Sequence, residues 1–338
     1  MRHSRSIPLL LLCMVLAGCG AHGGADRAPA AAAQPASPWS NDFDAAKAAA
    51  GRQGKDVLVF FTGSDWCPWC IRLRNEVLDT PEFLASAVQT FVLVEADFPR
   101  NRTLLPAAVQ VRNEKLKNAF SIEGFPTVLL LDAQGRPYAR TGYLTGGTTN
   151  YLPHLAALRQ VRERRDAAWS KAEAAQGAEK ARWLAEGLSA MDDDLVAACL
   201  TSVVARVKAL DPNDPSGVVR KFEYRAKLRE LEKSLSSAGA PPADAAQRVD
   251  AFIAASRAAG EELQKAMLLK LVAYPPRTAD NVEAAIRLLE EMIAVDPKTA
   301  TALRAKSVIL PAALRYRERF QRPPGGSPPP TPPGAPPP

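Results

Sequence analysis

The chain has 338 residues, of which 47% are hydrophobic and 23% charged, as in a globular protein with room for about two domains. Its net charge of +7 is uneven, because residues 37–152 hold 12 basic and 12 acidic residues, whereas residues 153–322 hold 28 and 23. The chain has only three histidines, two of them in its first 22 residues. This argues against a hydrolase built on a Ser-His-Asp or Cys-His arrangement.

The first residues have the layout of an export signal. A basic start is followed by an apolar run over residues 7–16 and by small residues before Cys19. We predict a signal peptide over residues 1–18, since the run is shorter than the roughly 20 residues that a membrane-spanning helix needs. Residues 16–19, Leu-Ala-Gly-Cys, resemble a bacterial lipobox, which implies lipidation of Cys19. The simpler alternative is an ordinary signal peptide cut nearby, with Cys19 incidental.

The next segment predicts a tether. Residues 19–38 are rich in Ala, Gly and Pro and have almost no large apolar side chain, so they cannot pack a core. No later segment is apolar enough to cross a membrane. We therefore expect an exported body that lipid on Cys19 holds at a membrane surface, in the bacterial cell envelope and facing the periplasm.

Residues 39–160 alternate helical and strand patterns. A continuous apolar run at residues 57–62 predicts a buried parallel strand, and further strands are expected at residues 91–96, 127–131 and 138–143, the last two joined by a hairpin turn. Helices are expected between and after them, at residues 43–50, 67–78, 114–120 and 150–160. A break is expected at Pro81 and an irregular loop at residues 98–111. The order predicts an α/β domain with a mixed sheet flanked by helices.

From residue 161 to 322 the patterns are helical, which predicts a second, all-α domain. Proline-containing breaks are expected at residues 211–215, 239–242, 275–276 and 296–297. Two segments end with an apolar pair followed by Asp-Pro, which resembles the close of a tetratricopeptide-type helical hairpin, although the copies share no clean period. Residues 323–338 contain ten prolines and predict an extended, disordered tail.

The end of the helical region is basic. Residues 304–322 hold six basic residues against Glu318. We predict no nucleic-acid partner, because an exported chain does not meet nucleic acid. The basic segment could face anionic lipid or envelope polymers, although a solvated helix face is the simpler interpretation.

Five cysteines are present. Cys13 leaves with the signal peptide and Cys19 would carry lipid. Cys199 lies in an apolar helical run, where a buried and inert thiol is expected. The remaining pair, Cys67 and Cys70, has no second pair to complete a zinc site and no following histidine for haem attachment. We therefore predict no metal and no organic cofactor, with a redox-active disulfide in their place.

The pair has the spacing that thiol chemistry needs. The buried strand at residues 57–62 leads through a short loop to Cys67-Pro68-Trp69-Cys70, where a helix is expected to begin. The thiolate form is favoured at a helix N-terminus, and three-residue spacing puts both sulfurs on one face. The second thiol can then resolve a mixed disulfide formed by the first.

The stretch from Trp66 to Cys70 resembles the active-site motif of the thioredoxin superfamily, and the resemblance covers about residues 41–160. It implies that Cys67 is the nucleophile and Cys70 the resolving thiol. Pro68 suits the first helical turn because it lacks an N–H. Trp66 and Trp69 are expected to shape the rim of the site.

A second segment strengthens this resemblance, 55 residues after the motif. Gly124-Phe125-Pro126-Thr127 resembles the segment in which the family carries a cis-proline before a strand. It implies that Phe125, Pro126 and Thr127 lie against the cysteine pair and present backbone to the substrate.

The chain departs from the family at one functional position. The family's buried acid, which assists the resolving thiol, aligns with Phe60, and the acid's lysine partner aligns with Leu93. Asp65, Glu95 and Asp97 are candidates to replace the acid, as is water. Each carboxylate is also explained as a loop, surface or strand-end residue.

These observations favour a protein-disulfide oxidoreductase acting on exported proteins or a redox partner. Its partners would be protein thiols and disulfides and a membrane redox carrier, with reduction favoured over oxidation or isomerisation. A static disulfide is the alternative for the pair, but so short a loop gains little stabilisation from closure. The second hypothesis is a non-catalytic interaction or assembly lipoprotein whose helical domain binds a partner.

Overall fold

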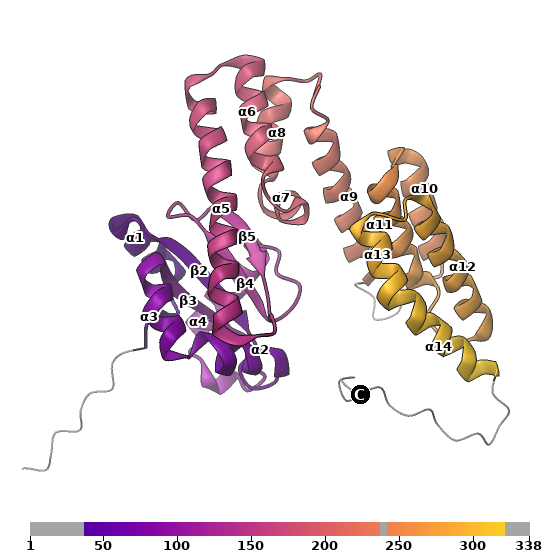
Figure 1. Cartoon of the computed structure of the whole chain (residues 1–338), viewed down its shortest axis with the longest axis horizontal. Helices are drawn as coiled ribbons and strands as arrows, with labels where there is room; N and C mark the ends of the chain where they lie inside the picture. The colour runs from indigo at the N-terminus through magenta and orange to yellow at the C-terminus, as the bar shows by residue number, and fades with distance from the viewer. Residues whose placement is uncertain (1–36, 237–241, 322–338) are drawn as a thin grey trace, which may run out of the picture. The chain divides into compact units, whose positions relative to one another are not determined.

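The computed structural model describes residues 37–236 and 242–321 (Figure 1). The predicted signal peptide, Cys19 and the Pro-rich tail lie outside the described residues. Every described helix and strand lies in one compact unit, Pro38–Pro338.

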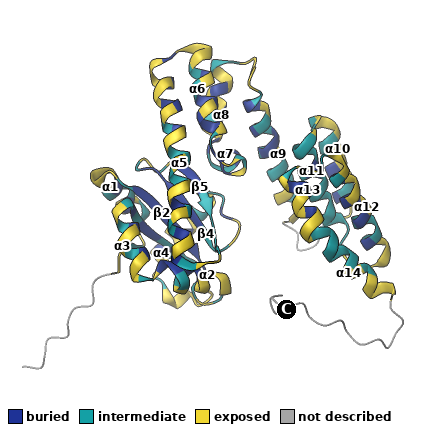
Figure 2. Ribbon diagram, in the orientation of Figure 1, coloured by how far each residue is buried: buried dark blue, intermediate teal, exposed yellow. Residues whose placement is uncertain are grey.

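A five-stranded mixed sheet forms the first part of this unit, with strand order β1-β3-β2-β4-β5. Strands β1 and β2 run parallel to β3, β4 is antiparallel to β2, and β5 is antiparallel to β4. Every residue of the central strand β2 is buried, as expected for a strand covered on both faces (Figure 2). The strands are β1 (Trp39–Ser40), β2 (Asp56–Thr62), β3 (Phe91–Asp97), β4 (Thr127–Leu131) and β5 (Pro137–Thr141).

Helices flank this sheet, which confirms the predicted α/β class. Strand β1, which the sequence pattern did not predict, has two residues and is too short to show one. The helices before β5 are α1 (Phe43–Gln53), α2 (Pro68–Leu73) with a π turn (Arg74–Leu78), α3 (Pro81–Thr90), a 3-10 turn (Arg102–Leu104) and α4 (Ala107–Ala119).

Two helices correct the sequence prediction. Pro81 begins helix α3 where a break was expected, because the preceding Thr80 accepts a hydrogen bond from the Phe83 N–H and caps the helix. A proline in the first turn gives up no helical hydrogen bond. Helix α4 begins at Ala107, so the expected loop at residues 98–111 is shorter than predicted.

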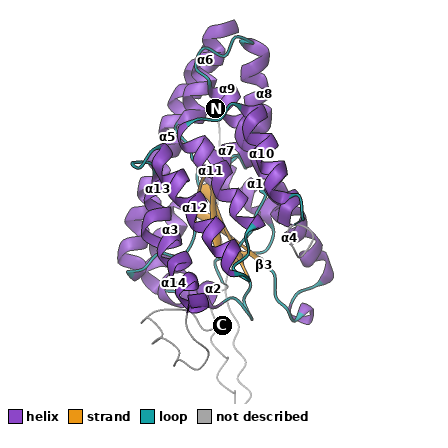
Figure 3. Cartoon of the chain, turned by 90° about the vertical axis from the view of Figure 1, so that its right-hand side faces the viewer, coloured by secondary structure: helices purple, strands orange, loops and turns teal. Residues whose placement is uncertain are grey.

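After β5, every described element is a helix (Figure 3), which confirms the predicted all-α region. The described prolines of the predicted breaks fall between helices. Within the described residues, each helix is too short or too polar to cross a membrane. The helices are α5 (Gly147–Ala174), α6 (Gly177–Ser189), α7 (Asp193–Cys199), α8 (Thr201–Leu210), α9 (Val218–Ser236), α10 (Ala245–Ser256), α11 (Gly260–Lys270) with a 3-10 turn (Leu271–Ala273), α12 (Ala279–Val295), α13 (Ala300–Arg304), a π turn (Ala305–Ile309) and α14 (Leu310–Gln321).

Helix α5 runs across the predicted domain boundary at residue 160. One buried apolar cluster does the same, since it extends from Leu58 and Cys70 through Trp169 to Phe222. Two smaller clusters lie further along the chain, centred on Val249 and on Met292. The sheet and the first helices after it therefore share a core.

Candidate active site

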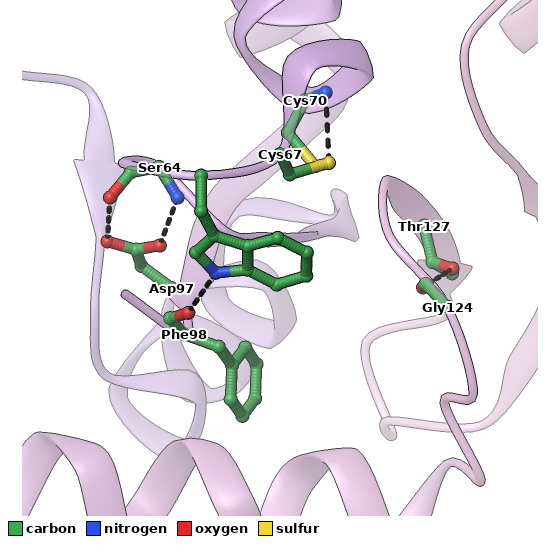
Figure 4. Close-up of a disulfide and its surroundings, with 8 residues drawn as sticks. Ser64, Cys67, Cys70, Asp97, Phe98, Gly124 and Thr127 are labelled. Carbon is green, nitrogen blue, oxygen red and sulfur yellow. Dashed lines mark hydrogen bonds between the residues drawn. A yellow bond between two sulfur atoms is a disulfide. The ribbon is translucent and has the colours of Figure 1, made fainter. Parts of the chain in front are cut away.

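The cysteine pair sits at the start of helix α2 and is joined as a disulfide, with 5.2 Å between the two Cα atoms (Figure 4). Cys67 is the N-cap of the helix, and its Sγ accepts a 3.3 Å hydrogen bond from the Cys70 N–H. Pro68 occupies the first turn, as predicted. Cys67 is 4% exposed and Cys70 1%, so Cys67 is the more accessible of the two. Because unpaired N–H groups at this end favour negative charge, a thiolate at Cys67 is stabilised there.

The loop before the pair is fixed by two carboxylates. Asp97, at the end of β3, accepts hydrogen bonds from the N–H of Ser64 at 2.9 Å and from its hydroxyl at 2.6 Å (Figure 4). Asp65 accepts from the N–H groups of Arg100 and Asn101, both at 2.9 Å. These two bonds lower the pKa of the Asp65 carboxyl. Both acids therefore hold backbone in place.

An aromatic wall borders one side of the site. The Trp66 indole N–H donates to the Phe98 carbonyl at 2.8 Å, and both rings pack on Phe125, with centroids 5.9 and 5.1 Å away. A Cβ on Gly63 would lie 2.4 Å from the Trp66 ring, so only glycine fits there. The guanidinium of Arg100 lies 5.2 Å from the centroid of the Trp66 ring. The structure thus brings together two predicted rim residues, Trp66 and Phe125.

The second predicted segment lies at the same end of the sheet as the motif. Thr127 begins β4 and pairs with Phe61, near the end of the strand that leads to Cys67. The Phe125–Pro126 peptide bond is cis, which confirms the prediction made from the resemblance. The Thr127 hydroxyl donates to the Gly124 carbonyl at 2.8 Å and closes the turn (Figure 4).

The other side of the site is built on Trp69, a residue that is 46% exposed. Its ring packs on Tyr143 with 5.2 Å between centroids, and the Arg72 guanidinium lies over both rings at 5.6 and 5.2 Å. The Glu76 carboxylate accepts from Arg72 Nε at 2.6 Å and from the Tyr143 hydroxyl at 2.7 Å. Both bonds lower the pKa of Glu76, and the Glu76 bond raises the pKa of Tyr143.

Sequence reasoning missed the three residues that support Trp69. Arg72 and Glu76 show the spacing of a helical ion pair, which is a local signal, but Tyr143 is 67 residues from Glu76. Only the packing of the segment after β5 against α2 brings it there.

The strand register places one carboxylate next to Phe60, the residue that aligns with the buried acid of the thioredoxin superfamily. Phe60 of β2 pairs with Glu95 of β3, whereas Leu93 pairs with Leu58. Paired residues point to the same face, and Phe60 lies in the buried cluster that contains Cys70. Glu95 forms an ion pair with Arg74, one helical turn after Cys70. Burial raises the pKa of Glu95, and the charge of Arg74 opposes that rise.

The remaining thiol lies away from these groups. Cys199 ends helix α7, is partly buried, and donates from Sγ to the Phe120 carbonyl at 3.5 Å. Burial raises the pKa of the thiol, which disfavours the reactive thiolate. Among the described residues, no group of three or more His, Cys, Asp or Glu is placed to hold a metal ion.

The fold and this constellation define a thioredoxin-like domain. Residues 43–155 match the family model described as thioredoxin-like domain, which is about a third of the chain. The solved structure of a DsbH oxidoreductase is 32% identical and covers 36% of this chain and 82% of that chain, with a TM-score of 0.34.

Three curated relatives share homology with this domain. The disulfide bond reductase DsbH of Chlamydia pneumoniae is 35% identical over 108 residues, 32% of this chain and 64% of that protein. The thioredoxin-related protein DsbJ of the same organism is 33% identical over 34% of this chain and 32% of its own length. The thiol:disulfide interchange protein DsbD of Vibrio vulnificus is 28% identical over 32% of this chain and 17% of its own length. The chain thus spans less than two thirds of each of these relatives.

Proposed function

We propose that the chain is a thiol–disulfide oxidoreductase in which Cys67 is the nucleophile and Cys70 the resolving thiol. The observation that carries this proposal is the disulfide at the N-terminus of α2, at the same end of the sheet as the cis-Pro126 segment. Homology to a disulfide bond reductase and to a thiol:disulfide interchange protein supports the class of reaction and favours reduction.

Reduction of a substrate disulfide takes two thiol–disulfide exchange steps. The Cys67 thiolate attacks one substrate sulfur, the substrate S–S bond breaks, and the other sulfur leaves as a thiolate and takes up a proton. Cys70 loses its proton and attacks the Cys67 sulfur, which releases the second substrate thiol and closes the Cys67–Cys70 disulfide. Two electrons have then passed to the substrate, and a dithiol partner must reduce the pair again.

The site can hold an extended substrate segment. The rims are Trp66 with Phe125 on one side and Trp69 with Tyr143 on the other. The cis-Pro126 turn precedes Thr127, whose backbone leads into β4. We propose that a substrate chain lies along this turn, with its sulfur directed at Cys67. Exported proteins and a membrane redox carrier are the proposed partners.

We propose export and lipid anchoring from the first residues of the sequence alone, since these lie outside the described residues. Lipid modification of the full chain should require Cys19. A Cys19→Ser chain expressed in a bacterial host should lose incorporation of labelled fatty acid. Labelling that persists in this variant would contradict the anchor.

A redox titration tests the activity. The chain beginning at Ser37 is equilibrated with glutathione or dithiothreitol buffers while tryptophan fluorescence is followed, because Trp66 and Trp69 border the disulfide. We expect a reversible two-electron transition, near about −270 to −220 mV for a reductase and about −180 to −120 mV for an oxidant or isomerase.

Two variants separate catalysis from a static bridge. Cys70→Ser should accumulate a mixed disulfide between Cys67 and a substrate protein, because the resolving thiol is gone. Cys67→Ser should form none, and Cys199→Ser should behave as the wild type. If no reversible redox transition occurs and Cys70→Ser accumulates no mixed disulfide, the proposal of an oxidoreductase fails. Partner binding by the helical region is then the remaining hypothesis.

A further inference from the structure

The loop that ends at Pro126 is held from outside the sheet. Residues 120–126, here called the cis-proline loop, link helix α4 to strand β4. The Arg229 guanidinium of helix α9 donates to the Ser121 carbonyl at 2.9 Å and to the Glu123 carboxylate at 2.6 Å, across 108 and 106 residues of sequence. The all-α region therefore contacts the loop directly.

Arg229 meets the loop in a largely enclosed place. Its side chain is 15% exposed and that of Glu123 54%, so the carboxylate lies at the outer edge of the contact. Lys233, one helical turn later on α9, lies 3.9 Å from the same carboxylate. Ser121 has a φ of 51°, a left-handed conformation that a residue with a side chain keeps only where its surroundings hold it. The bond from Arg229 to the Ser121 carbonyl is one of the contacts that hold it.

Helix α7 supports the same loop from the side of the core. Leu195 is 1% exposed and belongs to the buried cluster that contains Ile122 of the cis-proline loop. Arg225 of α9 ties this helix in place through ion pairs with Asp193 and Asp194, both at 2.9 Å. Two helices of the all-α region thus contact the loop, α7 through apolar packing and α9 through a charged side chain.

A substrate chain that lies along the Pro126 turn depends on the position of this loop. Glu123 precedes Phe125 by two residues, and Phe125 packs on Trp66 at the rim of the site. A shift of the backbone at Glu123 therefore moves the rim and the turn together. A misplacement of about 1 Å in a site that positions substrate can cost roughly a hundredfold in rate.

We propose that Arg229 is a positioning residue for the cis-proline loop, so that the all-α region completes the site for protein disulfides. This inference rests on the proposed function of the cysteine pair. Arg229 acts through the loop, and its effect therefore differs between substrates. A peptide disulfide that lies along the loop needs the contact, whereas a small disulfide that meets only Cys67 does not.

Single-turnover kinetics of the chain beginning at Ser37 test this difference, since that chain keeps every described residue. The pre-reduced chain is mixed with a disulfide-bonded peptide or with a small aromatic disulfide. Arg229→Ala should lower the second-order rate constant for the peptide by about tenfold or more and leave that for the small disulfide within about twofold. Arg229→Lys keeps a charged donor and should restore much of the loss.

Two further variants frame this result. Glu123→Gln, at an exposed position that tolerates substitution, should lower the peptide rate constant in the same direction, and it tests the contact even if Arg229→Ala does not fold. Arg220→Ala removes an exposed arginine from the same helix and should react as the wild type with both substrates. The reduction potential of the cysteine pair should be the same in all of these variants, because none of them alters helix α2.

Amide hydrogen exchange reads the loop without any turnover. The N–H groups of Ser121 and Ile122 are bonded to the carbonyls of Asn118 and Lys117, so their exchange reports opening of the loop. Arg229→Ala should speed their exchange by about fivefold or more.

Faster loop exchange together with a selective loss of the peptide rate supports the proposal. Faster exchange with an unchanged peptide rate reduces Arg229 to a structural contact and overturns it. Equal losses for the two substrates overturn it as well, because they place the defect at the thiols. If the wild type reduces neither substrate, the proposed function fails and this inference with it. If the wild type and Arg229→Ala reduce both equally well, only the positioning role fails.

Discussion

Glu76 receives hydrogen bonds from two groups that border the disulfide, the Nε of Arg72 and the hydroxyl of Tyr143. One carboxylate thus holds a cation and a phenol against the exposed Trp69 ring. The rim on this side of the site depends on a charge that titrates, whereas the Trp66 side is fixed by a backbone carbonyl.

Replacement of Glu76 by glutamine tests this dependence on charge. The two hydrogen bonds hold the pKa of Glu76 below its ordinary value of 4.5, so the carboxylate stabilises the fold above that value. This contribution is lost as pH falls through the lowered pKa. Urea unfolding should therefore find Glu76→Gln less stable than the wild type at neutral pH, with the difference shrinking toward about pH 3. An equal difference at both pH values would contradict the assignment.

We propose that Glu95, rather than Asp65 or Asp97, accepts the proton of Cys70. Asp65 and Asp97 are both occupied by the loop before the motif, whereas Glu95 lies beside Phe60 and contacts Arg74. Its raised pKa brings it closer to neutrality, where a general base is more effective.

We expect Glu95→Gln to slow the resolution step by about tenfold or more and to remove the rise in rate that follows deprotonation of Glu95. The measurement is the pH profile of the rate at which Cys70 releases a chromogenic aromatic thiol from Cys67. Glu82→Gln, an exposed glutamate on α3, is the matched control. If the profile of Glu95→Gln matches that of the wild type, water or another group takes the proton.

At the scale of elements, helix α5 is tied to the sheet by buried charge. Asp56, at the start of β2, is fully buried and accepts hydrogen bonds from the Tyr138 hydroxyl at 2.8 Å and from Arg159 and Arg162. Arg165 is also fully buried and donates to Asp132 at 2.7 Å, in the turn between β4 and β5. Asp132 also accepts from Arg136 Nε at 2.7 Å, so removal of Arg165 takes away the buried partner of this carboxylate and leaves the half-exposed one.

Arg165→Ala should lower the free energy of unfolding by about 2 kcal/mol or more. The loss includes packing, because the guanidinium lies 4.9 Å from the centroid of the Trp169 ring. Arg164→Ala, the exposed neighbour on the same helix, should stay within about 0.5 kcal/mol of the wild type in the same urea titration. Equal losses of stability in the two variants would show that the ion pair of Arg165 with Asp132 contributes nothing to the free energy of unfolding.

At the scale of the whole molecule, the core decides where the chain can be cut. The buried cluster that holds Cys67 and Cys70 continues to Phe222, and the cations that pair with Asp56 and Asp132 include Arg162 and Arg165. A chain cut at the predicted boundary of residue 160 loses both arginines and keeps both buried aspartates.

We expect a chain of residues 37–160 to be less stable than one of residues 37–236 by more than about 3 kcal/mol, because it loses the ion pairs of Arg162 and Arg165 with the buried aspartates and the apolar core that the later helices share with the sheet. Thermal unfolding followed by circular dichroism, with the Cys67–Cys70 disulfide intact in both, compares the two. A cooperative transition at the same temperature in both chains would show that the sheet is an independent domain.

Several helices and strands could be predicted from the sequence because their patterns involve only neighbouring residues. The strand patterns at residues 57–62, 91–96 and 127–131 each became a strand, and the order of strand, loop and helix placed Cys67 at a helix start. Helix α3 was missed because a proline both ends and begins helices, and the cap that decides between these is a contact of the Thr80 side chain.

The sequence by itself determined the spacing of the cysteine pair and the helical character of the second region, because spacing and periodicity belong to neighbouring residues. The cis-Pro126 segment was predicted from the resemblance of residues 124–127 to the thioredoxin superfamily. Only the tertiary structure decided which side chains surround the sulfurs. Tyr143 reaches Glu76, and Glu95 rather than Leu93 lies beside Phe60, because strand register and helix packing join residues that are distant in sequence. The same reason explains why α5 belongs to the sheet as much as to the helices after it.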